Sequence, residues 1–262
     1  MRGRRLLAGL GALLVLAPGS PAGSQEQQAE DASASVSQLE AALERDPGNP
    51  ALLVDLGLAY WRRDEFPRAL ETFRRAVEVG PESADAHNWL GVALSQASDL
   101  PGAIAEFRKA IALAPDYGRA YSNLGSTLAT SGDYVEAVEV FQKALALEPN
   151  SLGAHLNLGM ALREIGELEA ALLHLRHVAE GDPENAVIHY ELGQTLRQGG
   201  DLAAAVEALE RAIEIDPELR EGYYALGVCL RQQSAAARRA PPAASGPADA
   251  LYESARGAAG RG

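Results

Sequence analysis

His174 and His177 have the spacing closest to that of a metal site in this sequence. They stand three residues apart, so on a helix both rings lie on one face, and imidazole nitrogens are common ligands of Zn²⁺. No third ligand stands near them, and His87, His155 and His189 recur at wide intervals along the chain. The sequence therefore predicts a solvated histidine pair and no metal centre.

Catalytic motifs are missing from the sequence. It has no nucleophile elbow, no phosphate-binding loop, no zinc-protease helix and no dinucleotide-binding glycine pattern. The single cysteine, Cys229, excludes a disulfide within the chain and a Cys-x-x-Cys metal pair. We therefore expect a non-enzymatic protein without a cofactor, in which Cys229 is a small buried residue on a helix.

The charge balance of the chain is strongly acidic. The formal net charge is -13, and three of the arginines (Arg2, Arg4 and Arg5) lie in the first five residues. A surface of this sign repels phosphate backbones. Nucleic acid is therefore not expected as a partner.

Residues 1–24 have the features of a secretory signal. A basic start, MRGRR, precedes the apolar run Leu6–Ala17, which is too short to span a membrane as a helix, and small residues end at Ser24. We expect cleavage after Ser24, a polar flexible linker over 25–34 and a secreted or periplasmic protein. An uncleaved anchor is the alternative. No stable membrane span is expected after cleavage.

Proline recurs along the chain with a period of 34 residues. It occupies six equally spaced positions: 47, 81, 115, 149, 183 and 217. Alignment on these prolines gives five full units, 50–83, 84–117, 118–151, 152–185 and 186–219. The register predicts a repeat protein, and residue numbers within one unit are called positions below.

Other positions keep their residue type through all five units. Positions 7 and 8 are always Leu-Gly, and position 20 is always Ala. Position 24 is large and apolar: Phe73, Phe107, Phe141, Leu175 and Leu209. Glycine inside a helix costs about 1 kcal/mol relative to alanine, so its recurrence at position 8 indicates that two helices approach closely there.

Each unit is predicted to be a helix–turn–helix. Position 15 between the helices is glycine in three units (Gly132, Gly166 and Gly200), and position 16 is an acid in all five. The acid can cap the second helix and meets the positive end of its dipole. The proline at position 32 then ends that helix.

These positions resemble the tetratricopeptide repeat (TPR) family over about 200 residues. The resemblance implies an all-α fold, a right-handed α-solenoid of 34-residue helix-turn-helix repeats spanning 35–233. A half-repeat at 35–49 fits a second helix, and a half-repeat at 220–233 fits a first helix with Tyr223, Leu226-Gly227 and Leu230 in register. Such pieces can cover the ends of the stack.

The register fails after residue 233. Residues 234–247 are rich in Pro and Ala and predict a linker. Residues 248–262 resemble the first helix of a degenerate or truncated repeat, with Leu251, Ala255 and Ala258 at positions 4, 8 and 11.

In TPR proteins, the first helices line a concave groove that binds a ligand. On the matching positions we expect these groove residues: Trp61, Asn88, Trp89, Asn123, Asn157, Arg163, Tyr190, Gln194, Arg197 and Arg231. Arg163, Arg197 and Arg231 share position 12, which predicts a basic column in an acidic protein. Asn123 and Asn157 share position 6, and their amides can bond a peptide backbone.

The resemblance implies a protein–protein interaction scaffold that binds a peptide or protein segment in its groove. The basic column favours an acidic or carboxylate-bearing segment. Two alternatives stay open: the substrate-recognition part associated with an O-linked glycosyltransferase, which the asparagines suggest, and a structural assembly factor of the cell envelope.

Overall fold

The computed structural model describes residues 36–239. Every regular element in that range is an α-helix. The signal, the 25–34 linker and residues 240–262 lie outside the described residues, so the expectations for them stay predictions. None of the helices within 36–239 combines the length and the hydropathy that a membrane span needs.

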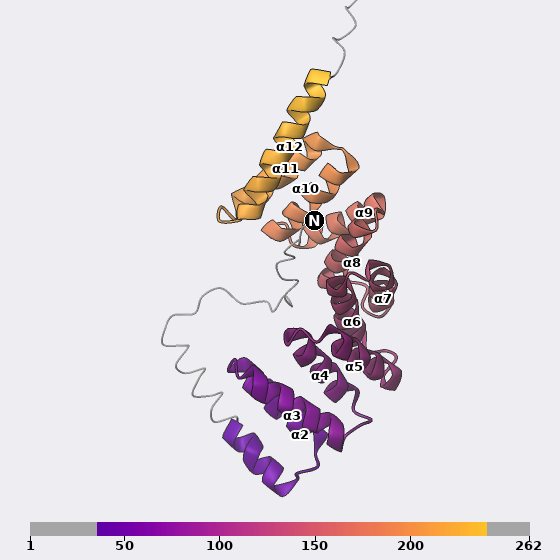
Figure 1. Ribbon diagram of the computed structural model, residues 1–262, viewed down its shortest axis with the longest axis vertical. Helices are drawn as coiled ribbons and strands as arrows, with labels where there is room; N and C mark the ends of the chain where they lie inside the picture. The colour runs from indigo at the N-terminus through magenta and orange to yellow at the C-terminus, as the bar shows by residue number, and fades with distance from the viewer. Residues whose placement is uncertain (1–35, 240–262) are drawn as a thin grey trace, which may run out of the picture. The chain divides into compact units, whose positions relative to one another are not determined.

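The helices follow one another in pairs (Figure 1). After a helix at 36–45 come α2 (Pro50–Arg62) and α3 (Phe66–Val79), α4 (Ala84–Gln96) and α5 (Leu100–Leu113), α6 (Gly118–Ser131) and α7 (Tyr134–Leu147), α8 (Leu152–Glu164) and α9 (Leu168–Gly181), α10 (Ala186–Gly199) and α11 (Leu202–Ile215), and finally α12 (Arg220–Arg239). The chain forms two compact units, 1–178 and 179–262. The predicted all-α solenoid of helix pairs is confirmed in each unit.

Within each unit, helices contact their neighbours in sequence, and first helices also contact the next first helix. In the first unit α2, α4 and α6 each contact both the second helix that follows and the first helix of the next repeat. In the second unit α10 contacts α11, and α12 contacts both of them. First helices therefore lie against first helices, which gives each unit a continuous first-helix face.

The position-8 glycines sit directly under the position-24 side chains. A Cβ added at Gly91 would lie 2.7 Å from the ring of Phe107, and one at Gly57 would lie 2.4 Å from the ring of Phe73. Phe73 and Phe107 are at most 1% exposed. The close helix approach inferred from the Leu-Gly pair is therefore confirmed, because the missing side chain makes room for the aromatic ring.

The turns between paired helices use a left-handed residue at position 15 in every repeat. Gly132, Gly166 and Gly200 have φ between 86° and 92°, and Asp64 and Ser98 adopt φ of 58° and 64° at the same position. The acid that follows caps the second helix through its side chain in two repeats, where Asp99 accepts from Gly102 N and Asp201 accepts from Ala204 N. Glu65 and Asp133 make no such bond.

The C-terminal helix is longer than the sequence predicts. α12 continues past Gln233 to Arg239, into the range expected to be a linker. The residues concerned, Ser-Ala-Ala-Ala-Arg-Arg, are mostly strong helix formers, and the first proline stands only at 241. Cys229 on this helix is fully buried, as expected.

Candidate peptide-binding face

The two expected asparagines on neighbouring first helices are half-buried, and each bonds to the preceding first helix. Asn123 on α6 donates from Nδ2 to Oδ1 of Asn88 on α4 at 3.0 Å. Asn157 on α8 donates from Nδ2 to Oγ of Ser126 on α6 at 3.2 Å. These two bonds, called the amide ladder below, fix the orientation of both amides.

Asn88 differs from the expectation that it faces a ligand directly. Its side chain is fully buried on α4, and its Oδ1 atom accepts from the amide of Asn123. Its Nδ2 atom has no hydrogen-bond partner among the described residues. Asn88 therefore supports Asn123 from beneath.

First-helix residues of the first unit line two cavities. A cavity of about 320 Å³ near the N-terminal end is lined by Gln38, Leu39, Asp55, Leu58 and Arg62. A smaller cavity of about 40 Å³ is mostly apolar and is lined by residues of α6, α7 and α8: Ser126, Ala129, Tyr134, Phe141, Asn157, Met160, Ala161, Arg163 and Glu164. Asn157 and Arg163, both predicted groove residues, therefore line the same cavity.

Sequence reasoning missed several residues that line these two cavities. Asp55, Leu58 and Arg62 stand at positions 6, 9 and 13 of the first repeat, and Ser126 stands at position 9 of the third. The register places all of these positions on the groove side, so position alone could have found them. Their residue types carried no signal of their own.

The two tryptophans pack within the protein. Trp61 meets the ring of Phe66 edge-on at 5.0 Å between centroids, and Trp89 stacks on Phe73 at 6.2 Å. Both are partly buried against the core. Each keeps only part of its ring available to a ligand.

The arginines of position 12 have different surroundings. Arg163 pairs with Glu164 at 3.1 Å, and its side chain is 14% exposed. In the second unit, Arg197 donates from Nε to Oε1 of Gln194 at 3.1 Å, and Gln194 donates to the hydroxyl of Tyr190 at 3.0 Å. Arg231 lies exposed on α12. The structure thus brings Tyr190, Gln194 and Arg197 together on one helix.

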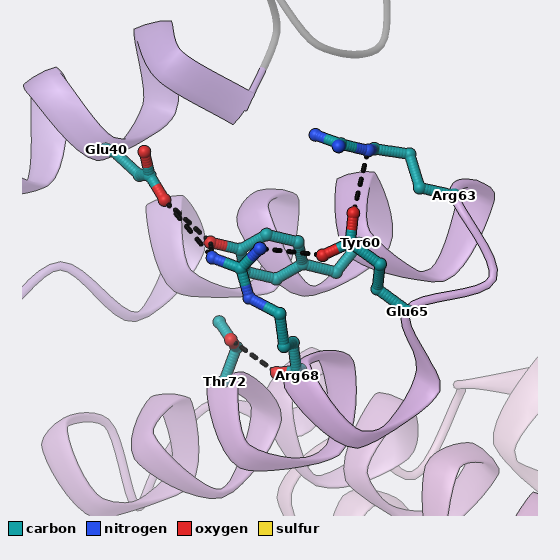
Figure 2. Close-up of polar contacts among 6 residues, drawn as sticks. All are labelled: Glu40, Tyr60, Arg63, Glu65, Arg68 and Thr72. Carbon is teal, nitrogen blue, oxygen red and sulfur yellow. Dashed lines mark hydrogen bonds and ion pairs between the residues drawn. The ribbon is translucent and has the colours of Figure 1, made fainter. Parts of the chain in front are cut away.

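A polar cluster joins the N-terminal helix at 36–45 to the first full repeat (Figure 2). The hydroxyl of Tyr60 donates to Glu40 at 2.7 Å and accepts from Arg68 at 2.6 Å. Burial and the neighbouring Glu40 carboxylate raise the pKa of Tyr60, and Arg68 also forms an ion pair with Glu65 at 2.7 Å. Each group is paired within the cluster, which favours a structural role.

Three histidines gather between α8 and α9. The sequence predicted only the pair His174 and His177, and the structure adds His155 from position 4 of the same repeat. Nδ1 of His155 lies 2.9 Å from Nδ1 of His174, and the ring centroids of His155 and His177 are 4.5 Å apart. Within residues 36–239, no group of three His, Cys, Asp or Glu side chains is arranged to hold a metal ion.

The tautomers of this histidine cluster follow from its hydrogen bonds. Nε2 of His155 lies 3.0 Å from the carbonyl oxygen of Pro149, so this nitrogen carries the hydrogen. With the hydrogen on Nε2, Nδ1 of His155 is the acceptor, and Nδ1–H of His174 donates to it. Burial lowers the pKa of His174, and the charges of His155 and His177 lower it further.

Acidification is expected to destabilise the α8–α9 repeat, because protonation places a charge on the half-buried His174 ring beside two other imidazole rings. Because the folded-state pKa of His174 lies below 6.5, the unfolded chain binds the proton first. The contribution of His174 to stability is therefore complete above about pH 6.5, and it is lost as the pH decreases through the folded-state pKa. Hydrogen exchange of α8 and α9 amides at about pH 7.5 and about pH 5 measures the loss.

His174→Gln should remove most of this pH dependence, whereas His189→Gln, in the next repeat, should keep it. An equal pH dependence in the wild type and in His174→Gln would contradict the assignment.

Comparison with known proteins places this arrangement in a class of helical-repeat proteins. Family models described as tetratricopeptide repeat match residues 22–78, 54–118, 95–151 and 128–180, and one described as TPR repeat matches 193–234. The chain belongs to the tetratricopeptide repeat family. A search of curated protein sequences returned no match.

Solved structures of similar fold are TPR proteins. YrrB, described as a TPR protein with an unusual peptide-binding site, is 26% identical, with a TM-score of 0.62 over 71% of this chain and 96% of YrrB. MamA from Desulfovibrio magneticus RS-1 is 22% identical, with a TM-score of 0.60 over 65% of this chain and 97% of that one. A TPR protein from Parabacteroides merdae is 17% identical, with a TM-score of 0.64 over 80% of this chain and 84% of that one.

Proposed function

We propose that this protein is a non-enzymatic scaffold that binds an extended peptide or protein segment along its first-helix face. The observation that carries the proposal is the oriented pair of amides, Asn123 and Asn157, on neighbouring first helices of the first unit. The similarity to YrrB, which is described as having a peptide-binding site, supports the same reading.

The amide ladder suits an extended backbone. An extended peptide presents N–H and C=O groups along its length, and an asparagine side chain both donates and accepts. Because Asn88 and Ser126 already hold the two amides, a ligand loses less free energy in ordering them. The apolar walls of the small cavity beside Asn157, among them Ala129 and Met160, suit a short aliphatic side chain of the same segment.

Peptide display tests this function. A displayed library of unstructured peptides should yield binders, and replacing both Asn123 and Asn157 with Ala should weaken them at least tenfold, through two lost backbone contacts. The matched control is Gln142→Ala, which removes an exposed amide from the second helix α7 and should leave binding unchanged. Equal affinity for the wild type and the double variant would refute the proposal, provided that circular dichroism shows both folded.

The second unit carries two of the position-12 arginines, Arg197 and Arg231, and a segment bound to that unit is proposed to carry carboxylates that meet them. Replacing Arg197 and Arg231 with Glu should lower the affinity for acidic peptides at least tenfold and leave neutral peptides unaffected, since like charges then face each other. The control makes the same charge change on two exposed basic residues of second helices, Lys143 and Arg176. A similar loss in both double variants would mean that net charge alone decides, and would contradict the arginine site.

A further inference from the structure

The last described helix, α12, exposes a face that the paired second helix covers on every earlier first helix. In the five full repeats, a Cβ on the position-8 glycine would lie 2.4–2.9 Å from the position-24 side chain of the paired second helix. At Gly227, the position-8 glycine of α12, nothing in the described part of the chain lies within 4 Å of such a Cβ. The space above Gly227 is called the socket below. Among the described residues it lacks the second-helix side chain that fills it in each full repeat.

The exposure of neighbouring side chains outlines the same face. Position 11 is at most 9% exposed in each full repeat, where it packs against the second helix: Tyr60, Leu94, Leu128, Leu162 and Leu196. Leu230 holds this position on α12 and is 43% exposed, and Tyr223 at position 4 is 51% exposed. Two large apolar side chains thus flank the open glycine, and an apolar face of this kind marks an interaction site.

The occupant that fits this face is encoded further along the chain. Second helices carry Ala at position 20, a large apolar residue at position 24 and Ala or Val at position 27, as in Ala103, Phe107 and Ala110. Residues 248–255, ADALYESA, repeat this spacing with Ala248, Tyr252 and Ala255. Pro247 precedes them, and proline suits the first turn of a helix.

We propose that residues 247–262 dock on α12 as the second helix of a sixth repeat, with the ring of Tyr252 over Gly227. If residues 248–262 instead formed a first helix, with Leu251, Ala255 and Ala258 at positions 4, 8 and 11, the face of α12 would stay uncovered. The second-helix register supplies the one side chain that the socket lacks.

The connecting segment is long enough for this fold-back. Gly227 lies about 18 Å along the helix from Arg239, at 1.5 Å per residue. The eight residues 240–247 span up to about 26 Å when extended. The docking therefore needs no change in α12.

Hydrogen exchange of the α12 amides in the full chain tests the docking. Tyr252→Glu removes the apolar ring, and Gly227→Leu fills the socket from the other side. Both should speed exchange at residues 223–231 at least tenfold. The control Ser254→Glu changes position 26, which is Arg, Lys or His in the five full units, and should leave exchange as in the wild type.

If no segment covers this face of α12, Gly227→Leu should change the exchange rate in the opposite direction. Glycine in a helix interior is unfavourable, so Gly227→Leu would then slow exchange, by about fivefold or less, because a Cβ there meets nothing. Tyr252→Glu would have no effect. Either result overturns the proposal, and so does protection that rises with protein concentration alongside a dimer in sedimentation velocity, because a second copy is then the occupant.

Discussion

Replacing Phe107 with Ala is expected to lower the free energy of unfolding by about 3–5 kcal/mol, the usual range for a buried phenylalanine. Its side chain is 1% exposed and lies over Gly91, where α4 meets α5. The large loss arises because glycine leaves no neighbouring side chain on α4 that could close the cavity. Urea unfolding followed by circular dichroism measures the change.

Val135→Ala is the control for Phe107→Ala. Val135 is apolar but 66% exposed on α7, so its truncation should cost less than about 0.5 kcal/mol. Comparable losses in the two variants would contradict the role given to the position-24 ring.

Gly91→Val is expected to destabilise the protein by about 1–3 kcal/mol, although glycine is a poor helix former. The new Cβ would lie 2.7 Å from Cε1 of Phe107, so the ring must move within a packed interface. Gly153→Ala is the matched control on a first helix, because a Cβ at Gly153 meets nothing within 4 Å. That variant should be neutral or more stable.

A double-mutant cycle separates overpacking from helix propensity. In a Phe107→Ala background the cavity receives the new side chain, so Gly91→Val should cost at least about 1 kcal/mol less than in the wild type. Additive effects of the two substitutions would show that Gly91 and Phe107 act independently, against the contact described above.

Much of the fold could be predicted from the sequence because packing requires particular residue sizes at fixed intervals. The proline period located each helix pair, and the Leu-Gly pair indicated where helices touch. The positive φ at Ser98 was not signalled by its residue type, since serine is not typical of this conformation; only the register, which aligns Asp64 and Ser98 with three glycines, indicated it. The extension of α12 was missed because the prolines at 241 and 242 made the preceding residues look like part of a linker.

The candidate site was predictable only to the level of helix faces. The register placed Asn123 and Asn157 on first helices, but it could not show that Asn88 lies beneath Asn123, because burial depends on how neighbouring helices cross. His155 is distant in sequence from His174 and His177. Their contact arises from the pairing of α8 with α9, which the spacing of histidines along the chain does not report.

The short range of the helix contacts has a consequence for how the chain folds. In each unit, the helix contacts that the structure describes join helices that are adjacent or next-but-one in sequence. Few loops must close before such contacts form, so low contact order favours fast folding, and folding can start at any repeat and spread. An N-terminal repeat can therefore acquire its packing while the C-terminal repeats are still being synthesised.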